Sequence, residues 1–282
     1  KWINDYGFEH TIQICTYNNS VPLIWFRINN PEEINKIKSY IEGIGEDIKL
    51  NELNNNYFTT TNPKEIIDSE VFTSGKLSVQ NPVNGFVINL IDREKAEFII
   101  DGCSAPGGKG SHISRKFPGS TIYSIDINGN RIKSIHDTID RLNITNITTM
   151  ELDMSKDALP MANTILLDVP CSGTGSIQRR PDAKWNKNIS MIRQLSIIQS
   201  QILDNATKYL KEGGSIIYST CSIEKEENLN IIDKILNNNS NYILENAANH
   251  VDDRIVNNNC IDVKPGFYNL DGAFAAKLTK IV

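Results

Sequence analysis

The sequence has 282 residues, of which 39% are hydrophobic and 22% charged, with a net charge of -5. That length permits one large domain, or one large and one small domain. No segment approaches the roughly 18 uncharged apolar residues of a membrane-spanning helix, which excludes an integral membrane protein. The 5 cysteines are too few and too widely spaced for a disulfide scaffold or a paired-CxxC zinc site, and the 4 histidines match no metal-ligand spacing. We therefore expect reduced thiols, no bound metal and a cytoplasmic location.

The first quarter of the chain carries most of the acidic excess and predicts a small α+β module at residues 1–76. Residues 21–29 form an apolar run that predicts a buried strand. A helix is expected at residues 31–44, because Asn30 is a suitable N-cap and Pro31 a suitable first helical residue. Residues 50–74 are expected to be irregular or strand-like.

Residues 77–282 follow a different pattern, in which short apolar runs alternate with helical stretches. The runs lie at residues 98–100, 121–125, 147–150, 164–167 and 215–218, and the clearest helical stretches are 131–142 and 190–210. Continuous apolar runs are typical of strands covered on both faces. The pattern therefore predicts a Rossmann-like α/β domain with a doubly wound, mostly parallel sheet. Such sheets bind their ligands beyond the carboxyl ends of the strands.

A glycine-rich loop follows the first of these strands and leads into a helix. The adjacent glycines allow a sharp turn and a close approach to a ligand. The spacing is neither that of a dinucleotide-binding motif nor that of a P-loop. We predict that this loop binds a cofactor; its residues are Cys103, Ser104, Ala105, Pro106, Gly107, Gly108 and Lys109.

Acidic residues end the next two strands. Asp126 follows the glycine-rich loop by about 20 residues, the spacing at which a carboxylate binds both ribose hydroxyls. Asp153 is a candidate partner for the exocyclic amine of an adenine, although capping of a local turn is nearly as common for such a residue. Together these features describe a nucleoside pocket without a phosphate site, which suits S-adenosyl-L-methionine.

Two cysteines lie beyond the carboxyl ends of two further strands. Cys171 follows the strand that ends near Asp168, and Cys221 follows the strand after Gly213 and Gly214. A single free cysteine is most often a packing residue. Two at matching strand ends beside a cofactor loop indicate chemistry.

Five segments in this order resemble the Sun family of RNA cytosine-5 methyltransferases: DGCSAPGGK, LLDVPCSGTG, RRPDAKW, GGSIIYSTCS and DGAFAAKL. The likeness extends to the earlier segments WFRIN and SVQNP, and it is strongest to the bacterial members that act on small-subunit ribosomal RNA. Two departures are small: Ser104 replaces a common alanine, and Ala273 replaces a common aromatic residue.

The resemblance implies a class I methyltransferase that uses S-adenosylmethionine and forms a covalent adduct between Cys221 and carbon 6 of cytosine. It also implies that Cys171 assists product release. From its place at the strand end we expect Asp168 to lie beside the cofactor or the target base, and we expect Lys109 to meet the cofactor carboxylate or the RNA. Cys103 is expected to be a packing residue in the cofactor loop.

RNA contacts are expected from residues 1–76 and from four side chains after the Cys171 loop, because cations bind phosphates and an exposed aromatic ring stacks on a base. The four are Arg179, Arg180, Lys184 and Trp185. We expect a monomer. Bacterial relatives commonly carry a helical NusB-like domain at the N-terminus; the chain begins with Lys1 rather than Met, so we expect that domain to be cut away or absent.

Three other readings remain open. The same chemistry can serve transfer RNA or large-subunit ribosomal RNA. A DNA cytosine methyltransferase would use Cys171 as its nucleophile. A ribosome-assembly factor would keep the fold without catalysis.

Overall fold

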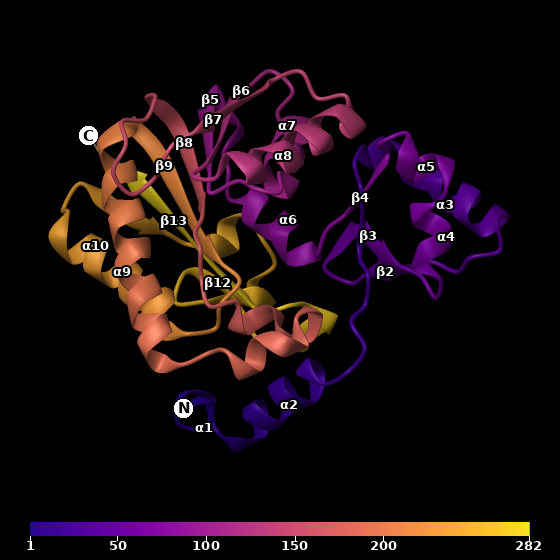
Figure 1. Ribbon diagram of the computed structural model, residues 1–282, viewed down its shortest axis with the longest axis horizontal. Helices are drawn as coiled ribbons and strands as arrows, with labels where there is room; N and C mark the ends of the chain where they lie inside the picture. The colour runs from indigo at the N-terminus through magenta and orange to yellow at the C-terminus, as the bar shows by residue number, and fades with distance from the viewer. Residues whose placement is uncertain (282) are drawn as a thin grey trace.

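A computed structural model describes residues 1–281, which contain two separate β-sheets (Figure 1). The larger sheet has the strand order β11-β12-β13-β9-β8-β5-β6-β7, with β10 paired to β13. Its central strands run parallel and are β7 (Ile147–Glu151), β6 (Thr121–Asp126), β5 (Phe98–Gly102), β8 (Ala162–Asp168) and β9 (Leu210–Thr220). This arrangement confirms the predicted Rossmann-like core.

The other part of the larger sheet is antiparallel and was not predicted. It consists of β10 (Tyr242–Glu245), β11 (Val256–Asn257), β12 (Cys260–Val263) and β13 (Ala273–Lys280). Strand β13 pairs with β9 in a register that sets Phe274 opposite Thr220. The C-terminal segment is thereby brought beside the end of β9, where Cys221 follows.

Helices cover both faces of the large sheet, as expected for a doubly wound fold. In Figure 1, α9 and α10 lie on one side, while α6, α7 and α8 lie on the other. Their bounds are α6 (Pro82–Asn89), α7 (Gly108–Lys116), α8 (Gly129–Leu142), α9 (Ile189–Ala206) and α10 (Leu229–Asn238).

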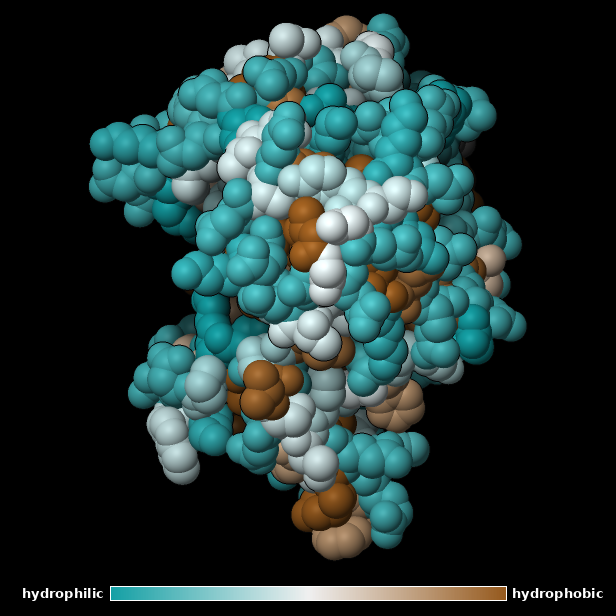
Figure 2. Space-filling model, turned by 90° about the vertical axis from the view of Figure 1, so that its right-hand side faces the viewer, coloured by the Kyte–Doolittle hydropathy of each residue, from teal (hydrophilic) through white to brown (hydrophobic). Residues whose placement is uncertain are grey.

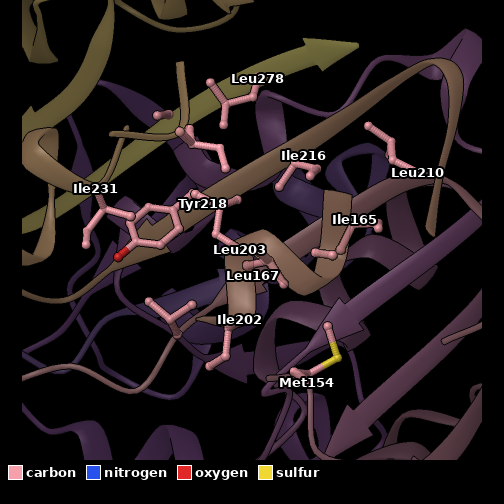
Figure 3. Close-up of a cluster of buried hydrophobic side chains, with 14 of the residues drawn as sticks. Met154, Ile165, Leu167, Ile202, Leu203, Leu210, Ile216, Tyr218, Ile231 and Leu278 are labelled. Atoms are coloured by element: carbon pink, nitrogen blue, oxygen red, sulfur yellow. The ribbon is translucent and has the colours of Figure 1, made fainter. Parts of the chain in front are cut away.

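Successive residues of β8 enter opposite halves of the core. Ile165 and Leu167 pack with Ile202 and Leu203 of α9 (Figure 3). Leu166, between them, packs on the other face in a cluster that includes residues of α6 and α7. Each face of the strand therefore buries apolar side chains, which explains the continuous apolar runs in the sequence.

The smaller sheet has the order β2-β3-β1-β4 and belongs to the N-terminal module. Its strands are β1 (Phe26–Ile28), β2 (Lys49–Asn51), β3 (Asn54–Thr59) and β4 (Leu77–Val79), and its helices are α3 (Ile34–Gly43), α4 (Pro63–Ile67) and α5 (Glu70–Thr73). The stacked rings of Phe26 and Phe58, with centroids 5.4 Å apart, lie in its core.

The boundary of this module differs from the expected division at residue 76. Strand β4 extends the small sheet to Val79. The first two helices, α1 (Trp2–Tyr6) and α2 (Phe8–Asn18), lie instead beside the catalytic domain (Figure 1), where Trp2 Nε1 donates to Glu224 at 2.9 Å. The module seen in the structure therefore runs from about β1 to β4.

Three predicted elements differ in extent. The strand predicted at 21–29 is confined to β1, because Val21 is 87% exposed and Pro22 has no amide hydrogen for a sheet. Residues 63–73 contain the helices α4 and α5 rather than irregular chain, and Pro63 starts α4. The helix predicted to end at Leu210 ends at Ala206, since Leu210 pairs with Ala162 in the sheet.

The side of the molecule seen in Figure 2 is mainly hydrophilic, with separate hydrophobic patches. Scattered apolar residues of this kind are normal on a protein surface. Within residues 1–281, none of the helices combines the length and apolarity needed to traverse a bilayer.

Candidate active site

A cavity of about 510 Å³ lies at the carboxyl ends of the parallel strands. This size is typical of a small-molecule site. Nine residues singled out from the sequence line it: Cys103, Ala105, Lys109, Asp126, Asp153, Asp168, Cys171, Arg180 and Cys221. The fold thus gathers, at one sheet edge, residues at or after the ends of five strands: β5, β6, β7, β8 and β9.

The cofactor loop turns sharply at Gly107 and carries Cys103 on the cavity wall. Gly107 has a φ of 93°, a left-handed conformation that favours glycine, and it precedes the first residue of α7. Burial, followed by the nearby charge of Asp168, raises the pKa of Cys103 to about 12. Cys103 is therefore a neutral thiol near pH 7, consistent with the packing role expected for it.

Asp126 is buried at the end of β6 and faces the cofactor loop. Its Oδ2 accepts a hydrogen bond from the amide of Ala105 at 3.2 Å, and its Oδ1 accepts one from Asn128 at 3.1 Å. A carboxylate offers about four lone-pair sites. Two acceptor positions consequently remain for hydroxyl groups of a ligand.

Asp153 lines the same cavity but also caps a turn of its own loop. Its Oδ1 accepts hydrogen bonds from the amide and the hydroxyl of Ser155, at 2.9 and 2.6 Å. These bonds, the hydroxyl bond foremost, lower the pKa of Asp153. Asp153 therefore has the capping role that the sequence left open. Its other oxygen, Oδ2, lies 3.2 Å from Lys156 Nζ.

Lys109 and Asp168 form an ion pair on the cavity wall, with Nζ 2.6 Å from Oδ2. Burial lowers the pKa of Lys109, but the charge of Asp168 and their hydrogen bond outweigh it, so the net shift is upward. Ser219 donates to the other oxygen of Asp168 at 3.1 Å. Both oxygens of Asp168 are thus acceptors, and Lys109 stays protonated beside the cysteines.

The two cysteines lie side by side, with their Sγ atoms 3.2 Å apart. The hydrogen bond with Cys171 lowers the pKa of Cys221, and the ammonium of Lys109 acts in the same direction. The same bond, followed by burial, raises the pKa of Cys171. Both shifts favour an arrangement in which the sulfur of Cys221 accepts a hydrogen bond from the thiol of Cys171.

The four residues expected to contact RNA have different environments. Arg179 is tied internally, because its Nε lies 2.5 Å from Asp271 Oδ2 and its Nη2 donates to Leu23 O. Arg180 lines the cavity. Trp185 is 81% exposed, and the ammonium of Lys184 lies 5.4 Å from the centre of its ring. Only the last three are open to a ligand.

Two residues of the cavity wall were not assigned roles from the sequence. Arg131 donates to Ala105 O at 3.1 Å and lies 3.5 Å from Asp126 Oδ2, so it fixes the cofactor loop to β6. Asp271 anchors the segment before β13 through Arg179. The signal for Arg131 was its place in the first turn of α8. Asp271 begins the segment DGAFAAKL, which the family resemblance marked without giving this residue a role.

Comparison with known proteins gives a consistent result. The family described as 16S rRNA methyltransferase RsmB/F matches residues 88–279. The chain is 32% identical to the ribosomal RNA small subunit methyltransferase B of Shewanella oneidensis over 77% of this chain and 51% of that protein. It is 31% identical to the protein of the same name from Pasteurella multocida, over 96% of this chain and 62% of that protein. The chain therefore spans about half to two thirds of the length of these curated relatives.

The fold also matches a solved structure. NSun6 from Pyrococcus horikoshii, solved with SFG, superposes with a TM-score of 0.85 over 100% of this chain and 97% of that one, at 18% identity. At that identity the likeness concerns the fold. The family match covers most of the large domain, including both cysteines and the cofactor loop. On these grounds the chain belongs to the RsmB/F family of 16S rRNA methyltransferases.

Proposed function

We propose that this chain is the catalytic part of an RNA cytosine-5 methyltransferase that acts on small-subunit ribosomal RNA. The observation that carries the proposal is the pair of cysteine sulfurs 3.2 Å apart at the cavity that Asp126 and the cofactor loop also line. The names of the two curated relatives point to the same substrate.

The cavity wall suits S-adenosylmethionine. Asp126 offers its two remaining acceptor positions to the ribose hydroxyls, and Asp153 lies on the same wall for the adenine amine. The solved relative NSun6 contains SFG, an analogue of this cofactor. When bound, S-adenosylmethionine supplies an electrophilic methyl group.

Cys221 is the nucleophile in this proposal. Carbon 5 of cytosine is a poor nucleophile until a thiolate adds to carbon 6, and covalent catalysis of this kind divides one difficult step into easier ones. The thiolate is the reactive form of cysteine. Because the pKa of Cys221 is lowered and that of Cys171 is raised, Cys221 forms the bond to carbon 6. Once carbon 5 carries the methyl group, a base takes the carbon 5 proton, the electron pair re-forms the double bond between carbons 5 and 6, and the bond from carbon 6 to sulfur breaks to return the thiolate.

Cys171 and the ion pair of Lys109 with Asp168 both assist Cys221 in this proposal. As a thiol, Cys171 donates a hydrogen bond to the sulfur of Cys221 and so stabilises it as a leaving group. Lys109 contributes a fixed positive charge that favours the Cys221 thiolate. Asp168 holds Lys109 in place from the end of β8.

Positively charged surfaces support an RNA partner. Arg180, Lys184 and Trp185 form one such surface. A second is a cavity of about 360 Å³ between the N-terminal module and α7. Its wall carries the cations Arg27, Arg115 and Lys116, and no carboxylate among residues 1–281. His112 lies on the same wall, but burial lowers its pKa well below the usual range, so it is neutral there. Cations without acidic partners favour a phosphate backbone.

We expect the protein to act as a cytoplasmic monomer.

The experiment that tests this function is bisulfite sequencing of ribosomal and transfer RNA from cells with and without the gene. The expected result is one or more cytosines in small-subunit ribosomal RNA that lose methylation when the gene is deleted. Loss confined to transfer RNA or large-subunit RNA would reassign the substrate. No loss in any RNA, together with no binding of S-adenosylmethionine in calorimetry, would indicate a non-catalytic assembly factor.

A further inference from the structure

Glu227 has an unusual environment for a glutamate. It lies in the single turn after Cys221, and its side chain is 0% exposed. Within residues 1–281, no lysine, arginine or histidine pairs with its carboxylate. A buried carboxylate without a cation needs hydrogen-bond donors to offset the loss of water.

Four donors surround the two oxygens of Glu227. Oε1 accepts from the amide of Ser172 at 2.8 Å and from Gln199 Nε2 at 3.0 Å. Oε2 accepts from the hydroxyls of Ser172 and Ser222, both at 2.5 Å. Four donors fill the lone-pair sites of an ionised carboxylate, so Glu227 is saturated as an anion.

The partners of Glu227 come from the two cysteine loops. Ser172 directly follows Cys171 after β8, and Ser222 directly follows Cys221 after β9. Gln199 of α9 ties the first loop further, since its Nε2 also donates to Pro170 O at 2.9 Å. One carboxylate therefore joins the residues next to both sulfurs. The loops also meet further along, where the amide of Gly175 donates to Cys221 O at 2.9 Å and the amide of Ile223 donates to Thr174 Oγ1 at 3.2 Å.

We propose that Glu227 is a positioning residue that holds Cys171 and Cys221 in contact and keeps their roles distinct. This inference rests on the proposed cysteine chemistry. A displacement of about 1 Å between reacting groups can slow a reaction on the order of 100-fold, so a group that sets a sulfur–sulfur distance has a large effect on rate.

The charge of Glu227 also acts unequally on the two thiols. It contributes to the raised pKa of Cys171, whereas Lys109 acts to lower the pKa of Cys221. Glu227 thus favours the neutral thiol on Cys171 while Lys109 favours the thiolate on Cys221. Geometry and charge assign the same roles to the two residues.

The test compares Glu227→Gln with the matched control Glu226→Gln, which changes the neighbouring, partly exposed glutamate of the same turn. The glutamine keeps the shape and two acceptor positions but removes the charge. Two quantities are measured: the rate of covalent trapping on an RNA hairpin containing 5-fluorocytosine, and the pH dependence of iodoacetamide labelling of each cysteine by mass spectrometry.

For Glu227→Gln we expect trapping to slow by at least about 10-fold, while Cys171 is labelled at a lower pH than in the unaltered chain. Glu226→Gln is expected to match the unaltered chain in both measurements. Unchanged trapping, or slower trapping without a shift in Cys171 labelling, would overturn the proposal, because a general loss of stability moves the first quantity alone.

Two further outcomes are covered. If circular dichroism shows that Glu227→Gln does not fold, Ser222→Ala replaces it in the test, because this change removes one donor and leaves the carboxylate. Slower trapping by Ser222→Ala then supports the proposal, and an unchanged trapping rate overturns it. If the unaltered chain shows no trapping, the proposed function fails. The labelling profiles need no RNA and still decide the role of Glu227.

Discussion

The Sγ atoms of Cys171 and Cys221 lie 3.2 Å apart although 50 positions separate the two residues in the chain. They meet because β8 and β9 are parallel neighbours whose register sets Asp168 opposite Ser219. Each cysteine follows its strand within three residues, so the sheet itself brings the two thiols together.

Cys221→Ala is expected to abolish covalent trapping on RNA containing 5-fluorocytosine, because the thiolate that attacks carbon 6 is lost. Cys171→Ala should still form the adduct and release it more slowly. Gel shift under denaturing conditions measures both. Cys15→Ala, which changes an exposed cysteine remote from the cavity, serves as control. The reverse pattern would assign the nucleophile to Cys171, as in DNA cytosine methyltransferases.

Lys109→Met should raise the pH at which Cys221 becomes reactive. A lowered pKa means that the thiolate persists as the pH falls below the ordinary thiol value, and the ammonium of Lys109 contributes to that shift. Without it, labelling of Cys221 by iodoacetamide should begin at higher pH. Lys133→Met, on the surface of α8, is the control. An unmoved profile would show that Lys109 does not set the reactivity of Cys221.

Arg179→Met and Arg180→Gln should have different effects, because Arg179 is paired with Asp271 and Arg180 faces the cavity. We expect Arg179→Met to lower the free energy of unfolding by roughly 1–3 kcal/mol without changing the salt dependence of RNA binding. Arg180→Gln should leave stability intact and reduce the slope of log affinity against log salt by about 1. Denaturant titration and filter binding measure the two quantities, and equal slopes for both variants would remove Arg180 from the RNA surface.

Gly175→Ala should disturb the cysteine loops, because a Cβ there would lie 2.2 Å from Gly272 O and 2.8 Å from Cys221 O. Both contacts are with backbone, so the loops must shift, at a cost on the order of 1–3 kcal/mol. We expect a lower thermal midpoint and slower trapping. Gly119→Ala, with nothing within 4 Å of the added carbon, should leave both unchanged. Normal trapping in Gly175→Ala would mean that this approach does not position Cys221.

Local patterns predicted the parallel core and much of the candidate site. The runs that became β5, β6, β8 and β9 are mainly apolar because both faces of these strands are covered, so consecutive residues are buried. The edge strand β7 is only half-buried or exposed along its length. Since parallel strands end at one edge, the residues after them were expected to meet. Asp126, Asp168, Cys171 and Cys221 do line one cavity.

The antiparallel strands and the anchoring contacts had no comparable local signal. Strand β13 is placed by pairing with β9, and Arg179 is held by Asp271, which lies 92 positions later. Glu227 is polar and follows a lysine and a glutamate, a pattern typical of a solvated turn, yet it is fully buried. Long-range partners of this kind are decided by packing and leave no periodicity in the sequence.

The sequence by itself determined the family resemblance, the type of sheet and the chemical groups that reach its carboxyl edge, because each depends on residue identity over short stretches. Only the tertiary structure decided which thiol has the lowered pKa, and it is that of Cys221, the nucleophile that the resemblance implies. That outcome depends first on the 3.2 Å contact between the two sulfurs. The charge of Lys109 then lowers the pKa of Cys221, and the charge of Glu227 raises the pKa of Cys171. Electrostatic effects fall with distance in three dimensions, and those distances exist only once β8, β9 and the cofactor loop are packed together.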